Sequence, residues 1–176
     1  MNVENKEKEV LDDYRKYVSD YKCNALDSYE WKISDSDMMN EIKTAPNTFS
    51  FVSDLFELFG FKMLLEFVPN GEEKTDIGDS KLYVSAVSFP VNISSFACCA
   101  VLRCRETSAV YLSAIQFDRD TRNIMCNVGA LKDLQNMSQF TFTVEMILID
   151  VFDKDGCCIT NDWIQSLGSN NNLSMI

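Results

Sequence analysis

The segment between Gly60 and Gly71 constrains the fold more than any other part of the chain. Hydrophobic side chains occupy every second position along it, at Phe61, Met63, Leu65 and Phe67. A period of two is typical of a β-strand with one buried face. The segment then reaches Pro69-Asn70-Gly71, which ends a strand because proline donates no backbone hydrogen bond and Asn-Gly accepts a positive φ. We therefore predict a strand over 60–68, followed by a turn.

Strand-like patterns recur along the rest of the chain, with little helix between them. The predicted strands cover 29–33, 48–52, 81–88, 96–104, 109–115 and 139–149. In the last of these, the side chains expected to face inward are Phe140, Phe142, Val144, Met146 and Leu148. Residues 129–134 are long enough only for a single helical turn. Several short strands of this kind are typical of an antiparallel β-sandwich.

The first part of the chain has a different pattern. Residues 5–22 are highly charged and carry apolar or aromatic side chains at spacings of three and four, at Val10, Tyr14, Tyr17, Val18 and Tyr21. This pattern predicts an amphipathic helix, which either packs against its own domain or begins a coiled coil with another copy. We expect an N-terminal helix over 1–24, a sandwich over 25–156 and a partly disordered C-terminal extension over 157–176.

Charge limits the classes of partner. The chain has 176 residues and a formal net charge of −11, so phosphate groups of nucleic acids and anionic membranes are repelled. No apolar run reaches the ~18 residues of a membrane span. The expected partner is therefore a protein or peptide, with a basic segment as the best match in charge.

The chain contains no histidine. This excludes Ser-His-Asp and Cys-His catalysis within the chain, as well as metal sites built on histidine. The seven cysteines include no C-x-x-C pair, and adjacent cysteines on a strand point to opposite faces. We therefore expect a non-enzymatic protein with no cofactor. The first nine residues are too charged for a signal peptide, which favours the cytoplasm and reduced thiols.

Three aspartates near the end of the last strand leave an alternative open. Asp150, Asp153 and Asp155 precede Gly156, and clustered aspartates in sandwich loops bind calcium in lipid-binding C2 domains. The other interpretation is a tight turn over 153–156, because Asp and Gly suit turns sterically.

Four segments, taken in order, resemble the TRAF-C or MATH (meprin and TRAF homology) domain family. Residues 60–71 are similar to its G-[YF]-K-[MW]-x-L-x-[IVF]-x-x-[NK]-G segment, and 30–33 to its opening W-x-I strand. Residues 80–87 are similar to its L-S-L-[YF]-L strand, and 140–146 to its closing strand. The order and spacing hold over about 27–153. The resemblance implies an all-β, antiparallel sandwich of about eight strands that binds short extended peptides, as an adaptor in signalling or the ubiquitin pathway.

The resemblance also implies which residues bind the peptide. Tyr83 matches the aromatic residue that packs against the peptide, and Glu72 falls where some adaptors have an acidic residue after the Asn-Gly turn. Glu66 and Val68 fall where signalling adaptors carry Arg and Tyr, so a basic peptide is expected instead of an acidic one. With Lys62, these residues are expected on the outward face. A self-associating scaffold formed through the N-terminal helix and a C2-like calcium-dependent lipid binder are the alternative functions.

Overall fold

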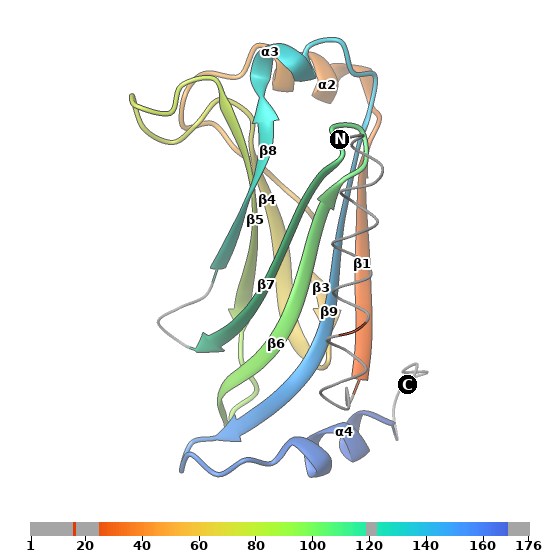
Figure 1. The fold of residues 1–176 in the computed structure, drawn as a ribbon, viewed down its shortest axis with the longest axis vertical. Helices are drawn as coiled ribbons and strands as arrows, with labels where there is room; N and C mark the ends of the chain where they lie inside the picture. The colour runs from red at the N-terminus through yellow and green to blue at the C-terminus, as the bar shows by residue number, and fades with distance from the viewer. Residues whose placement is uncertain (1–15, 17–24, 119–122, 169–176) are drawn as a thin grey trace.

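Two antiparallel β-sheets pack face to face in the computed structural model, which describes residues 16, 25–118 and 123–168 (Figure 1). One sheet has the strand order β1-β9-β6-β7, and the other has the order β2-β4-β5-β8 with β3 also paired to β4. The strands are β1 (Ala25–Ile33), β2 (Phe51–Val52), β3 (Phe56–Leu58), β4 (Phe61–Val68), β5 (Asp79–Ser88), β6 (Ile93–Cys104), β7 (Ala109–Asp118), β8 (Asn123–Ala130) and β9 (Phe140–Asp153). The predicted all-β antiparallel sandwich is confirmed.

The predicted N-terminal helix falls almost wholly outside the described residues. Lys16 is the one described residue before Ala25, and it is helical and exposed. The division of the chain at residues 24 and 156 stays a prediction, and the tail over 169–176 also lies outside the described residues.

The core lies between the sheets and follows the alternation seen in the sequence. The inward side chains of β4, at Phe61, Met63, Leu65 and Phe67, are all 0% exposed, and so are the five expected ones of β9. Aromatic rings stack at its centre: the Phe96 ring lies 4.0 Å from that of Phe61 and 5.0 Å from that of Phe117, measured between centroids. The period of two therefore identifies the buried face correctly.

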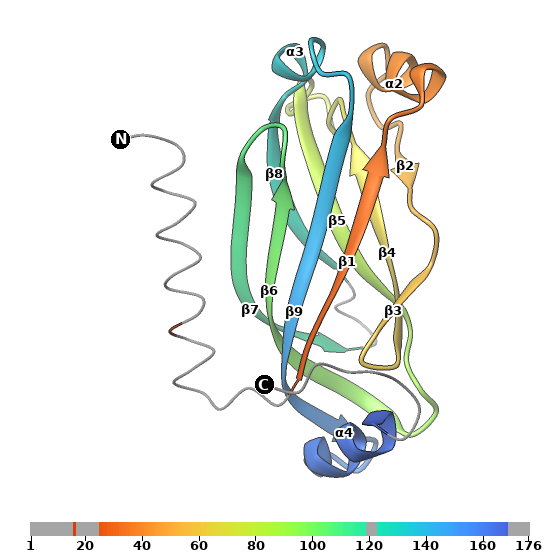
Figure 2. The same cartoon turned by 90° about the vertical axis from the view of Figure 1, so that its right-hand side faces the viewer.

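Short helices close the two ends of the sandwich (Figure 2). At one end lie α2 (Ser36–Lys43) and α3 (Leu131–Leu134). Helix α2 begins where the Asp35 carboxylate accepts hydrogen bonds from the backbone N–H groups of Asp37 and Met38, at 3.0 and 3.1 Å. Such an N-cap satisfies donors that a helix leaves free. The sequence pattern had predicted α3 but not α2.

At the opposite end lies α4 (Thr160–Gly168), which the strand patterns also missed. Its Trp163 packs against the core and donates a hydrogen bond from Nε1 to the backbone oxygen of Phe59, at 2.9 Å. A Cβ on Gly60 would lie 3.1 Å from both the Trp163 ring and the Leu167 side chain. Glycine at this position therefore allows α4 to approach the turn between β3 and β4.

Candidate functional site

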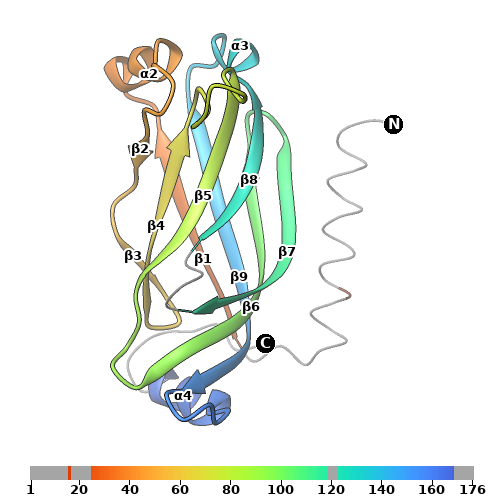
Figure 3. The same cartoon turned by 90° about the vertical axis from the view of Figure 1, so that its left-hand side faces the viewer.

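The β2-β4-β5-β8 sheet turns its outer face toward the viewer in Figure 3. The strand register places a row of side chains across four strands of this face. Strand register places Val52 opposite Glu66, Glu66 opposite Tyr83, and Tyr83 opposite Met125. Val52 and Met125 are 54% and 41% exposed, whereas Glu66 and Tyr83 are half-buried. Adjacent strands lie about 4.8 Å apart, so the row spans roughly 14 Å. It offers apolar side chains at both ends and polar groups between them.

The loop between β4 and β5 folds back over this face. It turns at Gly71, where φ is +75° and an added Cβ would lie 2.2 Å from the backbone oxygen of Asp76. Only glycine adopts this conformation without cost, and no side chain fits at that approach. The turn brings Glu72 above the sheet, where its carboxylate accepts a hydrogen bond from the Tyr83 hydroxyl.

Two asparagines hold the loop in place. The Asn47 side-chain amide donates hydrogen bonds to the backbone oxygens of Asn70, Gly71 and Glu73, at 3.0, 3.0 and 3.2 Å. Asn70 donates to the Ala45 oxygen at 2.9 Å, and its own side-chain oxygen accepts from the Gly78 N–H at 2.9 Å. The loop backbone is thus fixed by partners on both sides, which positions Glu72 before any ligand arrives.

Electrostatics favour a neutral Tyr83 and a paired Lys81. Burial, with the nearby carboxylate of Glu72, raises the pKa of the Tyr83 hydroxyl well above its usual range. The Lys81 ammonium forms an ion pair with Asp76, and the hydrogen bond between them lowers the pKa of the Asp76 carboxyl and raises that of the lysine. The charge of Lys81 on β5 is therefore balanced by Asp76 of the loop, and the carboxylates of Glu72, Asp76 and Glu66 all raise the pKa of Tyr83.

The structure brings together three of the five residues expected to bind a peptide. Tyr83, Glu66 and Glu72 are neighbours, because Glu66 pairs across the strands with Tyr83 and Glu72 bonds to its hydroxyl. Lys62 is exposed on the same face but lies four residues from Glu66 along β4, roughly 13 Å away.

Val68 lies on the outer face as expected, but it is not accessible there, since it is only 2% exposed. Its partner across the strands is Lys81, which Asp76 of the folded loop holds in place. The parity of β4 puts Val68 on the outer face, but the loop and the lysine beside it account for its burial. It therefore offers no surface to a peptide.

The sequence patterns missed Val52, Met125 and Asn47 as parts of this site. Met125 lies on β8, which had not been predicted as a strand, although the alternation of Ile124, Cys126 and Val128 was the available signal. These three side chains are buried, and Met125 points to the other face. The role of Asn47 depends on a contact with a loop more than twenty residues away, which no local pattern reveals.

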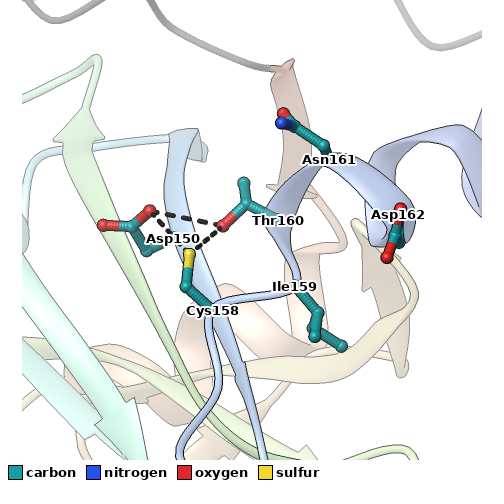
Figure 4. A pocket seen from close by; sticks show the side chains of 6 residues that line it. All are labelled: Asp150, Cys158, Ile159, Thr160, Asn161 and Asp162. Atoms are coloured by element: carbon teal, nitrogen blue, oxygen red, sulfur yellow. Dashed lines mark hydrogen bonds between the residues drawn. The ribbon is translucent and has the colours of Figure 1, made fainter.

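A separate polar hollow lies where β9 meets α4 (Figure 4). Its Thr160 hydroxyl accepts a hydrogen bond from the Val151 N–H at 2.9 Å and donates to the Asp150 carboxylate at 3.3 Å. The Cys158 sulfur lies 3.2 Å from the same hydroxyl and 3.5 Å from the carboxylate. These contacts fasten the start of α4 to the end of β9, so we assign the cluster a structural role.

The aspartates considered for calcium do not converge. Asp153 Oδ1 accepts hydrogen bonds from the N–H groups of Asp155 and Cys157, at 2.9 and 2.8 Å, and the Gly156 N–H donates to the Asp153 backbone oxygen at 3.1 Å. The tight turn over 153–156 is thereby confirmed. Across the described residues, no three His, Cys, Asp or Glu side chains form a group able to hold a metal ion. The C2-like alternative therefore gains no support.

Comparisons with known proteins leave the family open. No family model matches the chain, and no curated protein matches it in sequence. The solved structures that match include Notothenia coriiceps TRAF5, which is 15% identical, with the match covering 81% of this chain and 84% of that chain at a TM-score of 0.42. A likeness this distant assigns neither family nor function. Separately, none of the described helices is both long enough and apolar enough to cross a membrane.

Proposed function

We propose that this protein is a non-enzymatic interaction module that binds a short, extended and basic peptide segment on the outer face of the β2-β4-β5-β8 sheet. The observation that carries the proposal is the row formed by Val52, Glu66, Tyr83 and Met125, with Glu72 held above it. Tyrosine and methionine are enriched where proteins bind one another, because each offers a large contact area. The family resemblance points to the same face through Tyr83.

Charge at the centre of the row favours a basic ligand. Glu66 and Glu72 flank Tyr83, and Lys81, two residues before Tyr83 on β5, is already paired with Asp76. An arginine or lysine of the peptide would meet these two carboxylates, while apolar side chains on either side of it would contact Val52 and Met125. Charge complementarity of this kind speeds association and rejects ligands of the wrong sign.

The sheet also offers backbone groups to an extended chain. Strand β8 ends the sheet, and no other strand pairs with its second edge among the described residues. Peptides commonly bind by adding a strand to such an edge, with their side chains selected by pockets on the adjacent face. Met125 lies on β8 itself, so a strand added at this edge would pass the Met125 end of the row and cross the row's direction, whereas a peptide that also reaches Val52 must lie across the strands. An adaptor role in signalling or the ubiquitin pathway rests on the family resemblance alone.

A charge-resolved peptide library tests the proposal. We expect the full chain to select extended peptides with a basic residue between apolar ones, and Tyr83→Ala to weaken binding at least about tenfold, the loss of one aromatic contact worth ~1.4 kcal/mol. Glu66→Lys should abolish selection of basic peptides, because it reverses the charge beside Tyr83. Asp155→Lys is the matched control, since it makes the same charge change at an exposed turn at the end of β9.

Two results would contradict the proposal. If Tyr83→Ala binds every selected peptide as tightly as the unaltered chain, Tyr83 is not in the site. If Glu66→Lys and Asp155→Lys reduce binding equally, the selection reflects the net charge of −11 and not this face.

A further inference from the structure

The outer face of the other sheet, β1-β9-β6-β7, carries an apolar cluster separate from the core. Cys99, Val101 and Ile147 are 3%, 0% and 1% exposed, and Leu26, Val110, Leu112 and Ile149 pack against them. These side chains point away from the core, because the alternate residues of β6 (Cys98, Ala100 and Leu102) belong to the core between the sheets. The outer face of an antiparallel sandwich sheet is usually polar. An apolar outer face of this kind is suited to being covered.

We propose that the N-terminal segment of this same chain, residues 1–24, docks on this outer face as an amphipathic helix. Strand β1 begins at Ala25 and is the edge strand of this sheet. Its second residue, Leu26, already belongs to the cluster. Residues 1–24 therefore join the sandwich at the border of the surface that they would cover. A tether this short gives the segment a high effective concentration at the face, which favours it over a second copy.

The dimensions of the segment and the face agree. A helix over 5–22 would be about 27 Å long, and the nine residues of β1 extend for about 30 Å. A helix of this length would cover most of the length of β1 and about two thirds of that of the 12-residue β6. The alternative occupant is a second copy of the chain. Its association restricts the translation and rotation of two molecules, at a free-energy cost that a tethered segment avoids.

The helical pattern also provides the matching apolar side. Val10, Tyr14, Tyr17, Val18 and Tyr21 fall on one side of a helix with 3.6 residues per turn. Lys16 projects from the opposite side of that helix, and the structure describes Lys16 as helical and exposed. An exposed Lys16 leaves the tyrosine side free to contact the sheet. The docked arrangement uses the segment within one molecule, so it does not form a coiled coil, and it leaves the peptide-binding face on the other sheet accessible.

Thiol labelling of the full chain, mapped residue by residue by mass spectrometry, tests the proposal. Cys99 reports on the outer face, Cys98 on the core, and Cys157 is exposed. We expect Cys99, which is 3% exposed, to react at least about tenfold more slowly than Cys157, and the variants described below measure how much of this protection the helix supplies. This protection should not change when the protein is diluted, and the chain should sediment as a monomer.

A pair of charge-matched variants then identifies what covers the face. Tyr14→Glu with Tyr17→Glu should raise the Cys99 labelling rate to within about threefold of Cys157, while Cys98 stays protected and shows that the core remains folded. Lys16→Glu changes the net charge by the same amount on the opposite side of the helix and should leave Cys99 protected.

Three outcomes would overturn the proposal. Fast labelling of Cys99 in the unaltered chain would show an open face. Protection that disappears on dilution, together with a dimer or trimer in sedimentation, would show that a second copy is the cover. Equal labelling of Cys99 in the tyrosine variant and in Lys16→Glu would show that the tyrosines do not contact it. The first two measurements need no substitution, so the proposal remains testable even if the tyrosine variant does not fold.

Discussion

The Tyr83 hydroxyl donates a hydrogen bond to the carboxylate of Glu72, so the loop after β4 is fastened to the middle of the sheet face. The two residues come from different parts of the chain: Tyr83 from the centre of β5, and Glu72 from the turn that Gly71 makes possible. This single contact connects the conformation of the loop to the surface proposed to bind peptides. Its strength can be measured through the ionisation of the tyrosine.

Tyr83 should ionise at a higher pH than an ordinary tyrosine, because burial and the Glu72 carboxylate raise its pKa. The folded state therefore holds the proton more tightly than the unfolded chain. Its stabilising contribution is complete below the ordinary tyrosine pKa of ~10 and is lost as the pH rises above it. Ultraviolet titration, with Tyr83→Phe to assign the signal, measures the shift.

Two carboxylate substitutions separate the causes of that shift. Glu72→Gln should lower the Tyr83 pKa toward its usual value, since it removes the nearest negative charge. Glu73→Gln, at the next position in the same loop, should leave the titration unchanged, because Glu73 is not among the groups that shift Tyr83. An identical curve for Glu72→Gln and the unaltered chain would show that the contact does not form in solution.

Gly71→Ala should destabilise the protein more than Gly78→Ala. Both glycines have positive φ, +75° and +91°, so either alanine costs about 1–2 kcal/mol. Only at Gly71 does the new Cβ meet the backbone of Asp76, whereas nothing lies within 4 Å at Gly78. Urea unfolding should therefore give a larger loss for Gly71→Ala by at least ~1 kcal/mol. Equal losses would mean that the loop relaxes without cost.

The sequence predicted the long strands well because their signal is local. The alternation along β4 and β9 arises from the pleat itself. Every side chain of these two strands that the alternation assigned to the inward face is buried. Strand β3 is only three residues long, too short for a period to show, and of the strand predicted over 48–52 only Phe51 and Val52 form β2. Helix α4 escaped notice because its partner, the Phe59 backbone, is 104 residues away.

The candidate site was only partly predictable for the same reason. The family resemblance implied Tyr83, Glu66 and Glu72, and the structure brings these three residues together. The burial of Val68 was missed because parity gives the side of a strand on which a side chain lies but cannot show that a loop folds over it. Asn47 acts only through its contacts with that loop, so nothing in its own neighbourhood marks it.

The Asp76–Lys81 pair should make the loop sensitive to acid and to alkali. The pair lowers the pKa of Asp76, so its contribution is present above the ordinary Asp pKa of ~3.9 and is lost as the pH falls further. It raises the pKa of Lys81, so the same contribution is lost as the pH rises above ~10.4. Asp76→Asn should flatten the acid side of a stability–pH curve, whereas Asp155→Asn, in an exposed turn, should not. Parallel curves for Asp76→Asn and the unaltered chain would refute the pairing.

Phe96→Ala should be among the most damaging single substitutions. Phe96 is fully buried and stacks between Phe61 and Phe117, so its removal leaves a cavity that costs about 3–5 kcal/mol. Phe49→Ala removes the same atoms from a ring that is about half exposed just before β2 and should cost about 1 kcal/mol or less. Urea unfolding of both variants measures the difference, and similar losses would place the centre of the core elsewhere.

Trp163 tests whether α4 is a working part of the sandwich. Trp163→Phe keeps a ring against Phe61 but removes the hydrogen bond to the Phe59 oxygen, which should cost about 0.5–1.5 kcal/mol. Trp163→Ala also removes the packing and should cost about 2–4 kcal/mol, and it should release α4 to amide exchange while the strands stay protected. Asn161→Ala, exposed in the first turn of the same helix, controls for helix propensity and should change stability by under ~0.5 kcal/mol. If Trp163→Ala lowers the free energy of unfolding no more than Asn161→Ala does, the packing of α4 against the core contributes nothing to stability, because the loss of a docked side chain should destabilise the whole sandwich.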